Sequence, residues 1–170
     1  EATDESTAEG KLVYFMSIDG ARFRKPVEDP ANADFMNALD HVNALAEAAP
    51  GFVWRLKGEG NNATDLKPYD DPNMAINMSV WESVEALAAF VYRNMDHRGV
   101  MRRRREWFEE MPVYMALWWV PVGAVPTVEE AKAKLALLEK SGPTAEAFTF
   151  KQPFAAPSGD DVAPVLDECA

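Results

Sequence analysis

The chain has 170 residues, 48% of them hydrophobic, which is enough for one domain with a sizeable core and excludes wholesale disorder. Its formal net charge of −11 excludes nucleic acid as the main partner, because phosphate binding needs a basic surface. The longest apolar run, Val113–Val120, is too short to cross a bilayer as a helix, so no membrane insertion is predicted.

The single cysteine, Cys169, allows neither an intrachain disulfide nor a cysteine-based zinc site. Without a recognisable secretory signal, this composition predicts a cytoplasmic protein, or one in an organelle interior if a leader has been removed. The segments 1–10, which is acidic, and 155–170 predict flexible tails around a single domain at 11–154. If the tails are ordered, a partner in a larger assembly would explain it.

Strands and helices alternate along the predicted domain, and several helix boundaries have clear local signals. Asp29-Pro30 suits a helix start, because Asp accepts from free amides and Pro fits the first turn, while Pro50-Gly51 ends that helix. Ser83 can cap a second helix, and Thr127-Val-Glu-Glu130 is a capping box. The predicted elements are strands at 12–18, 52–56, 74–81 and 113–122, and helices at 29–49, from 84, at 97–110 and at 127–140.

This order predicts an α+β fold of the ferredoxin-like β-α-β-β-α-β type, with an antiparallel sheet, helices on one face and one helix appended. The strand at 74–81 alternates, so Asn77 and Ser79 share the face opposite to Ile76 and Met78. The sheet face without helices needs a cover, and a second copy of the chain is the simplest one. We therefore expect a homodimer in which the sheets pack face to face.

The helix predicted at 97–110 carries the main candidate site. At about 100° per residue, His97 and Arg104 lie one heptad apart on one apolar stripe. An inward arginine must be paired or meet an anion, so Arg104 is a candidate anchor for an acidic ligand and His97 a candidate proton carrier. The alternative is structural: Arg104 pairs with a carboxylate of the protein, and His97 caps the helix start beside Asp96.

Large aromatic side chains add to this candidate site, because their surfaces suit a flat ligand. They can equally fill a core or a dimer interface. Asn77 is a polar strand residue that needs a partner if it is buried. The candidate ligand-binding residues on these grounds, besides Arg104, are Trp54, Asn77, Trp107, Phe108 and Trp118.

Five sequence blocks resemble an uncharacterised, mainly bacterial family known only as a domain of unknown function, and the resemblance covers about residues 11–154. This family is similar to the dimeric α/β-barrel superfamily, which also contains antibiotic-biosynthesis monooxygenases and haem-degrading monooxygenases. The resemblance implies a dimeric α/β barrel and monooxygenase-like activity. The blocks are Gly51-Phe-Val-Trp-Arg-Leu56, Asn77-Met-Ser-Val-Trp-Glu-Ser-Val-Glu-Ala-Leu87, Arg102-Arg-Arg-Arg-Glu-Trp-Phe108, Leu117-Trp-Trp-Val-Pro121 and Gly142-Pro-Thr-Ala-Glu-Ala-Phe-Thr-Phe150.

Haem-degrading members of that superfamily use an aromatic residue and a histidine on the second helix, together with an asparagine on the first strand. By this resemblance Phe90 or Tyr92 is the aromatic residue, and His97 falls at approximately the histidine position. The predicted first strand, at 12–18, contains no asparagine, which argues against haem chemistry.

These observations predict a homodimer that binds an aromatic or anionic metabolite between helices and sheet, with His97 as acid/base and Arg104 as anion anchor. The resemblance implies a cofactor-independent monooxygenase-like enzyme. Neither a cofactor nor a metal site is predicted. One alternative is a haem or metal binder that uses His97 as ligand. Another is a non-catalytic subunit of a larger complex, tethered through its tails.

Overall fold

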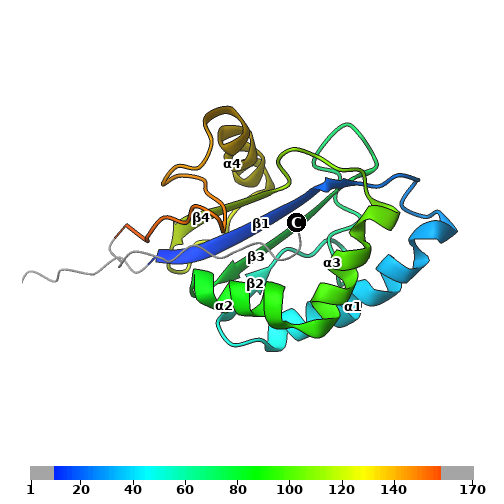
Figure 1. The fold of residues 1–170 in the computed structure, drawn as a ribbon, viewed down its shortest axis with the longest axis horizontal. Helices are drawn as coiled ribbons and strands as arrows, with labels where there is room; N and C mark the ends of the chain where they lie inside the picture. Colours follow the sequence, from blue (N-terminus) through cyan, green and yellow to red (C-terminus); the bar gives the residue numbers. More distant parts are fainter. Residues whose placement is uncertain (1–9, 158–170) are drawn as a thin grey trace, which may run out of the picture.

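The structure is a computed structural model that describes the backbone of residues 10–157 and the side chains of residues 22–157 (Figure 1). The predicted tails, 1–10 and 155–170, lie almost entirely outside these residues, as does Cys169. In the described part, no helix is both long and apolar enough to cross a membrane.

The fold is α+β, built on a four-stranded antiparallel sheet with the strand order β2-β3-β1-β4. The chain order confirms the predicted β-α-β-β-α-β sequence with one helix appended. The strands are β1 (Gly10–Arg22), β2 (Phe52–Arg55), β3 (Met74–Trp81) and β4 (Met115–Pro121). The helices are a 3-10 turn (Pro30–Asn32), α1 (Ala33–Ala48), α2 (Val84–Ala88), a π-helical turn η2 (Ala89–Arg93), α3 (Met95–Trp107) and α4 (Val128–Ser141).

Side-chain caps begin the helices where the sequence predicted them. The Asp29 side chain accepts from the Ala31 amide at 2.8 Å, at the turn that leads into α1. Ser83 Oγ accepts from the Ala86 amide at 3.0 Å, and Thr127 Oγ1 from the Glu130 amide at 3.1 Å. These bonds occupy amides that have no partner inside the helix, so they fix where α2 and α4 start.

The segment between α2 and α3 differs from the prediction, which began a helix at His97. After α2 the chain makes the π-helical turn η2, and Asn94 is extended. The Asn94 side chain accepts from the amides of Asp96, at 3.1 Å, and His97, at 3.0 Å. Asn94 is therefore the N-cap of α3, and His97 lies in the first turn of the helix.

Helices cover both faces of the sheet, so the prediction of helices on one face was wrong (Figure 1). The face of β3 that carries Trp81 packs against α2, whereas Met78 and Val80 on the other face pack in one cluster with Leu135 and Leu138 of α4. The appended helix can reach that face because it follows β4, an edge strand. Helix α4 thus covers part of the sheet face on which the sequence predicts a second copy of the chain.

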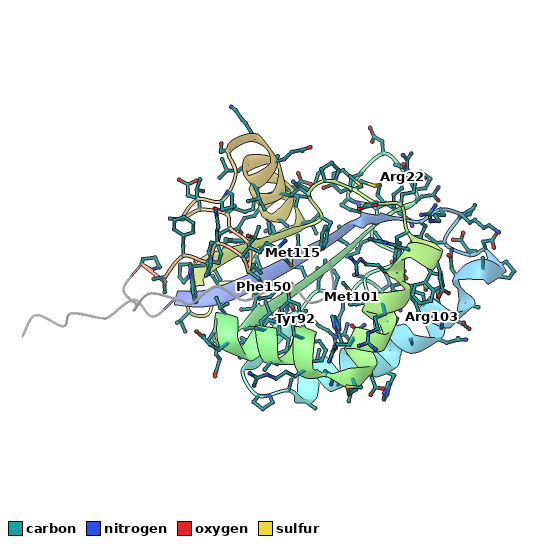
Figure 2. The ribbon with its side chains drawn as sticks, in the orientation of Figure 1. Arg22, Tyr92, Met101, Arg103, Met115 and Phe150 are labelled. Carbon is teal, nitrogen blue, oxygen red and sulfur yellow. The ribbon has the colours of Figure 1, made fainter. Side chains whose placement is uncertain are left out.

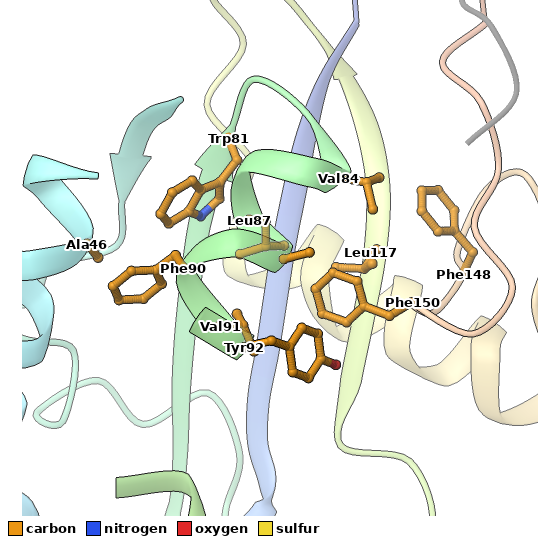
Figure 3. Close-up of a cluster of buried hydrophobic side chains, with 11 residues drawn as sticks. Ala46, Trp81, Val84, Leu87, Phe90, Val91, Tyr92, Leu117, Phe148 and Phe150 are labelled. Carbon is orange, nitrogen blue, oxygen red and sulfur yellow. The ribbon is translucent and has the colours of Figure 1, made fainter. Parts of the chain in front are cut away.

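The largest of the buried hydrophobic clusters lies where α2 and the segment after α4 meet the sheet (Figure 3). The Trp81 ring stacks on Phe90 with centroids 5.4 Å apart, and Phe148 pairs its backbone with that of Leu117 on β4. This packing closes the α2 end of the sheet and leaves α1 and α3 to cover the rest of the same face.

Gly51, between α1 and β2, lies in close contact with α2. It has φ +83°, and a Cβ at this position would lie 2.5 Å from the Cβ of Ala86. Gly123 has φ +81° with open space around it. We expect Gly123→Ala to cost about 1 kcal/mol, for the backbone strain alone, and Gly51→Ala to cost about 2 kcal/mol more because of the clash. Urea unfolding measures both; equal losses would contradict the close packing.

Candidate functional site

A cavity of about 710 Å³ lies between α1, α3 and the sheet face that carries Asn77 and Trp81. This volume is within the range of small-molecule sites, which are mostly apolar with a few polar groups that fix orientation. Apolar side chains from several elements line it, among them Phe35 of α1, Phe90 of η2 and Phe108 at the end of α3. The cavity therefore lies within one chain, under the two longer helices of this layer.

Polar contacts connect α1 to α3 and show that the two helices run antiparallel. Arg103 donates to Asp34 at 2.8 Å near the end of α3, and His41 lies 3.4 Å from Asp96 near its start. Arg103 faces α1 in this way, whereas Met101, also on α3, lines the cavity (Figure 2). The helix that carries the candidate residues is thus held at both ends.

His97 lies at the start of α3, is only 6% exposed and lines the cavity. Its Nδ1 is 3.0 Å from the carbonyl oxygen of Val91, and its ring lies 5.0 Å from that of Phe90. Because a carbonyl oxygen only accepts, Nδ1 carries the proton and Nε2 has a lone pair. Within the described part of the chain, Nε2 has no hydrogen-bond partner. His97, a lining residue, therefore has an acceptor nitrogen that no described group uses.

Burial governs the protonation of His97. Desolvation disfavours the imidazolium and lowers the pKa of His97 to about 4, although the bond to the Val91 carbonyl raises it in part. The imidazole is therefore neutral at pH 7. The predicted alternative, in which His97 caps the helix, does not hold, because Asn94 is the cap.

Arg104 is half-buried on the cavity side of α3, one heptad after His97. Its guanidinium donates to the Met101 carbonyl oxygen at 3.1 Å, and no described carboxylate lies within ion-pair distance. The neighbouring Arg103 and the buried Arg55 are both paired, Arg55 with Glu47 at 2.7 Å. The predicted structural alternative, a protein carboxylate for Arg104, is therefore absent from the described residues.

Two asparagines complete the polar lining, and sequence reasoning missed one of them. Asn43 of α1 is 8% exposed, yet its carboxamide has no hydrogen-bond partner among residues 22–157, and the same holds for the half-buried Asn77. A buried amide left unpaired costs about 1–3 kcal/mol. Asn43 lies four residues after Leu39 and three before Ala46, both on the predicted apolar stripe, and this spacing was the signal available.

The structure brings five of the eight predicted site residues together and separates the other three. Trp107 packs against Phe35, with the Arg103 guanidinium 4.9 Å from its ring centroid. Trp54 and Trp118 belong to the cluster on the opposite sheet face, so placing them in this site was wrong. The residues that do line the cavity are Asn77, Phe90, His97, Arg104 and Phe108.

In residues 22–157 no group of three or more histidine, cysteine, aspartate or glutamate side chains could hold a metal ion. A ligand bound through a single protein nitrogen would have His97 Nε2 available. The polar lining as a whole can donate from Arg104, accept at His97, and do both at the asparagines.

The chain belongs to the family described as Domain of unknown function (DUF3291), whose model matches residues 15–164. A 3-hydroxyacyl-(acyl-carrier-protein) dehydratase FabZ of Paramagnetospirillum magneticum is 47% identical over 53 residues, 31% of this chain and 29% of that protein. The FabZ of Campylobacter concisus is 42% identical over 60 residues, 34% of this chain and 35% of that protein. The chain thus spans about a third of the length of these curated relatives.

Among solved structures, a protein of unknown function, NE2512 from Nitrosomonas europaea, is similar with a TM-score of 0.40 and 15% identity. The similarity covers 71% of this chain and 96% of that one.

The lowered pKa of His97 predicts a specific loss of stability in mild acid. Between about pH 6.5 and pH 4 the unfolded chain binds a proton at residue 97 and the native protein does not, so stability falls as the pH falls. Between pH 7 and pH 5 this amounts to about 2 kcal/mol. His97→Asn keeps a donor for the Val91 carbonyl and cannot titrate, so it should lack this loss.

Urea unfolding of each protein at pH 7 and pH 5 measures the difference. His41→Asn is the matched control, because His41 is 63% exposed, and it should keep the full loss. If His97→Asn loses as much stability as the unmodified protein, His97 is not buried in its neutral form.

Proposed function

We propose that this member of the DUF3291 family binds a small aromatic or anionic metabolite in the cavity between its helices and sheet. Arg104 anchors the anionic group, and His97 handles a proton of the ligand. The observation that carries the proposal is the half-buried Arg104 guanidinium, which lines the cavity without a described carboxylate to neutralise it.

The positive charge of Arg104 points to an anionic ligand. A partly desolvated cation is stabilised when an opposite charge lies beside it, and the planar guanidinium suits a carboxylate or phosphate. Arg103 and Arg55 obtain that charge within the protein, from Asp34 and Glu47 respectively. Arg104 is placed differently from both, and a ligand that enters the cavity can supply the missing charge.

The kind of reaction follows from the resemblance to the dimeric α/β-barrel superfamily, which includes antibiotic-biosynthesis monooxygenases. On this basis we infer a cofactor-independent monooxygenase-like enzyme. The strand order β2-β3-β1-β4 supports the resemblance. A neutral His97 that lines the cavity, with an Nε2 lone pair that no described group uses, suits the removal of a proton from an aromatic substrate.

Replacing Arg104 tests the anchor. We expect Arg104→Met to weaken the binding of 8-anilinonaphthalene-1-sulfonate, an aromatic anion, by about tenfold, because one charge-assisted interaction is lost. The matched control is Arg102→Met, since Arg102 is exposed and does not line the cavity. Dye fluorescence titration measures both, with circular dichroism to verify folding. Equal affinities of the two variants and the unmodified protein would refute the anchor role.

The resemblance also implies a homodimer with facing sheets. Helix α4 already packs on the sheet face in question, so a second copy has to bind beside it, near the edge strand β2 where Trp54 is partly exposed. Native mass spectrometry of the purified protein should show a mass of two chains and any small molecule that remains bound. A single-chain mass at micromolar concentration would contradict the dimer.

His97 also supports a second candidate, a haem protein. The buried imidazole has its Nε2 lone pair available in an aromatic-lined cavity, as an axial ligand requires. Added haemin should then give a shifted Soret band that His97→Ala abolishes and His41→Ala does not. A spectrum that is the same for all three proteins would eliminate this candidate.

A further inference from the structure

Two of the cavity's polar groups that have no full set of partners among residues 22–157, His97 and Arg104, lie at separate levels of the cavity. His97 and Arg104 lie on the same side of α3 and are seven residues apart, which is about 10 Å along the helix axis. Each is a cavity-lining group with unused hydrogen-bonding capacity among the described residues. A ligand that satisfies both must therefore be extended, with one polar group at each end.

Asn43 belongs to the His97 end. The contacts between Arg103 and Asp34 and between His41 and Asp96 show that α1 and α3 run antiparallel. Asn43 follows His41 by two residues on α1, so it lies level with the start of α3, where His97 is. This end of the cavity thus combines an acceptor, the His97 Nε2, with a buried carboxamide that can both donate and accept.

A hydroxyl group fits this end better than a charged group. Its hydrogen can be donated to His97 Nε2, and its oxygen can accept from the Asn43 amide, so one small group satisfies two buried polar side chains. A carboxylate would meet the imidazole lone pair with a lone pair of its own. The neutral state of His97 at pH 7 supports the same choice.

The Arg104 end offers donors. Its guanidinium has one carbonyl contact, and Arg105 also lines the cavity here. The described acidic residues that line this end, Glu109 and Glu110, are both exposed, and Glu109 lies 3.8 Å from Arg22, which also pairs with Asp71 at 2.6 Å. A carboxylate matches the planar fork of Arg104, because two parallel N–H groups can bond its two oxygens.

Aromatic side chains line the cavity near both groups. Phe90 lies against His97, and Phe35 and Phe108 are in edge contact with each other at 5.0 Å. All three line the cavity. Aromatic faces and edges of this kind favour a flat, unsaturated body between the polar groups.

We propose that the ligand is a hydroxyaryl carboxylate about 10 Å long, with its hydroxyl at His97 and Asn43 and its carboxylate at Arg104. This inference rests on the proposed function, since it concerns the same cavity. It adds the ligand's chemical class, its length and its orientation.

Three biphenyls of matched size test the two ends separately by calorimetric titration. The compound 4′-hydroxybiphenyl-4-carboxylate carries both groups, biphenyl-4-carboxylate lacks the hydroxyl, and biphenyl-4-ol lacks the carboxylate. We expect each deletion to raise the Kd by about tenfold. If the first two compounds bind equally, or if none of the three binds, the hydroxyaryl carboxylate is the wrong class.

Two variants test which ligand group lies at His97 and which lies at Arg104. His97→Asn should remove the preference for the hydroxyl and keep the preference for the carboxylate, whereas Arg104→Met should do the reverse. His41→Asn and Arg102→Met should keep both preferences, because neither residue lines the cavity. A variant that loses both preferences together would refute the two-ended orientation.

The experiment with 8-anilinonaphthalene-1-sulfonate distinguishes a wrong ligand class from a cavity that binds no anion at all. If Arg104→Met weakens dye binding and the biphenyls show no hydroxyl preference, only the ligand class is wrong. If the dye is also insensitive to Arg104, the anionic ligand itself is wrong.

Discussion

The hydrogen bond from His97 Nδ1 to the carbonyl oxygen of Val91 decides what the cavity can offer a ligand. It fixes the imidazole in the tautomer that has a lone pair on Nε2, and it holds the ring against Phe90. Two local features make the bond possible. The π-helical turn η2 carries Val91, and the Asn94 cap starts α3 so that His97 falls in its first turn.

The rest of the helical layer keeps the cavity open around this group. Polar contacts of α1 with α3 lie near both ends of α3, while hydrophobic packing is concentrated around α2 and Trp81. Between these regions Asn43 is buried, and its carboxamide has no hydrogen-bond partner among residues 22–157. Filling that space would stabilise the protein, so a cavity of this volume, lined by polar groups without partners among residues 22–157, indicates a ligand.

Local sequence signals predicted much of the fold and part of the site. The caps at Asp29, Ser83 and Thr127 and the alternation along β3 depend on neighbouring residues, and the structure confirms them. The heptad spacing of His97 and Arg104 likewise placed both side chains on the cavity side of α3. These features are encoded within one or two helical turns or one strand, where periodicity is informative.

Features that depend on distant contacts were not predictable in the same way. The face on which α4 packs, and with it the position of Trp118, follows from how the chain turns after β4. Trp54 faces away from the cavity because of the irregularity between Phe52 and Trp54 in the pairing of β2 with β3. Asn43 was overlooked because a single polar residue on an apolar stripe looks like the edge of the stripe until its burial is known.

The most direct test is to determine which ring nitrogen of His97 carries the proton. The imidazole nitrogens of the ¹⁵N-labelled protein can be observed by NMR at pH 7, with His41→Asn to assign the signals. The account predicts a neutral ring with a protonated Nδ1 and a pyridine-like Nε2, and a change at Nε2 when 4′-hydroxybiphenyl-4-carboxylate is added. A protonated Nε2, or a doubly protonated ring, would contradict it.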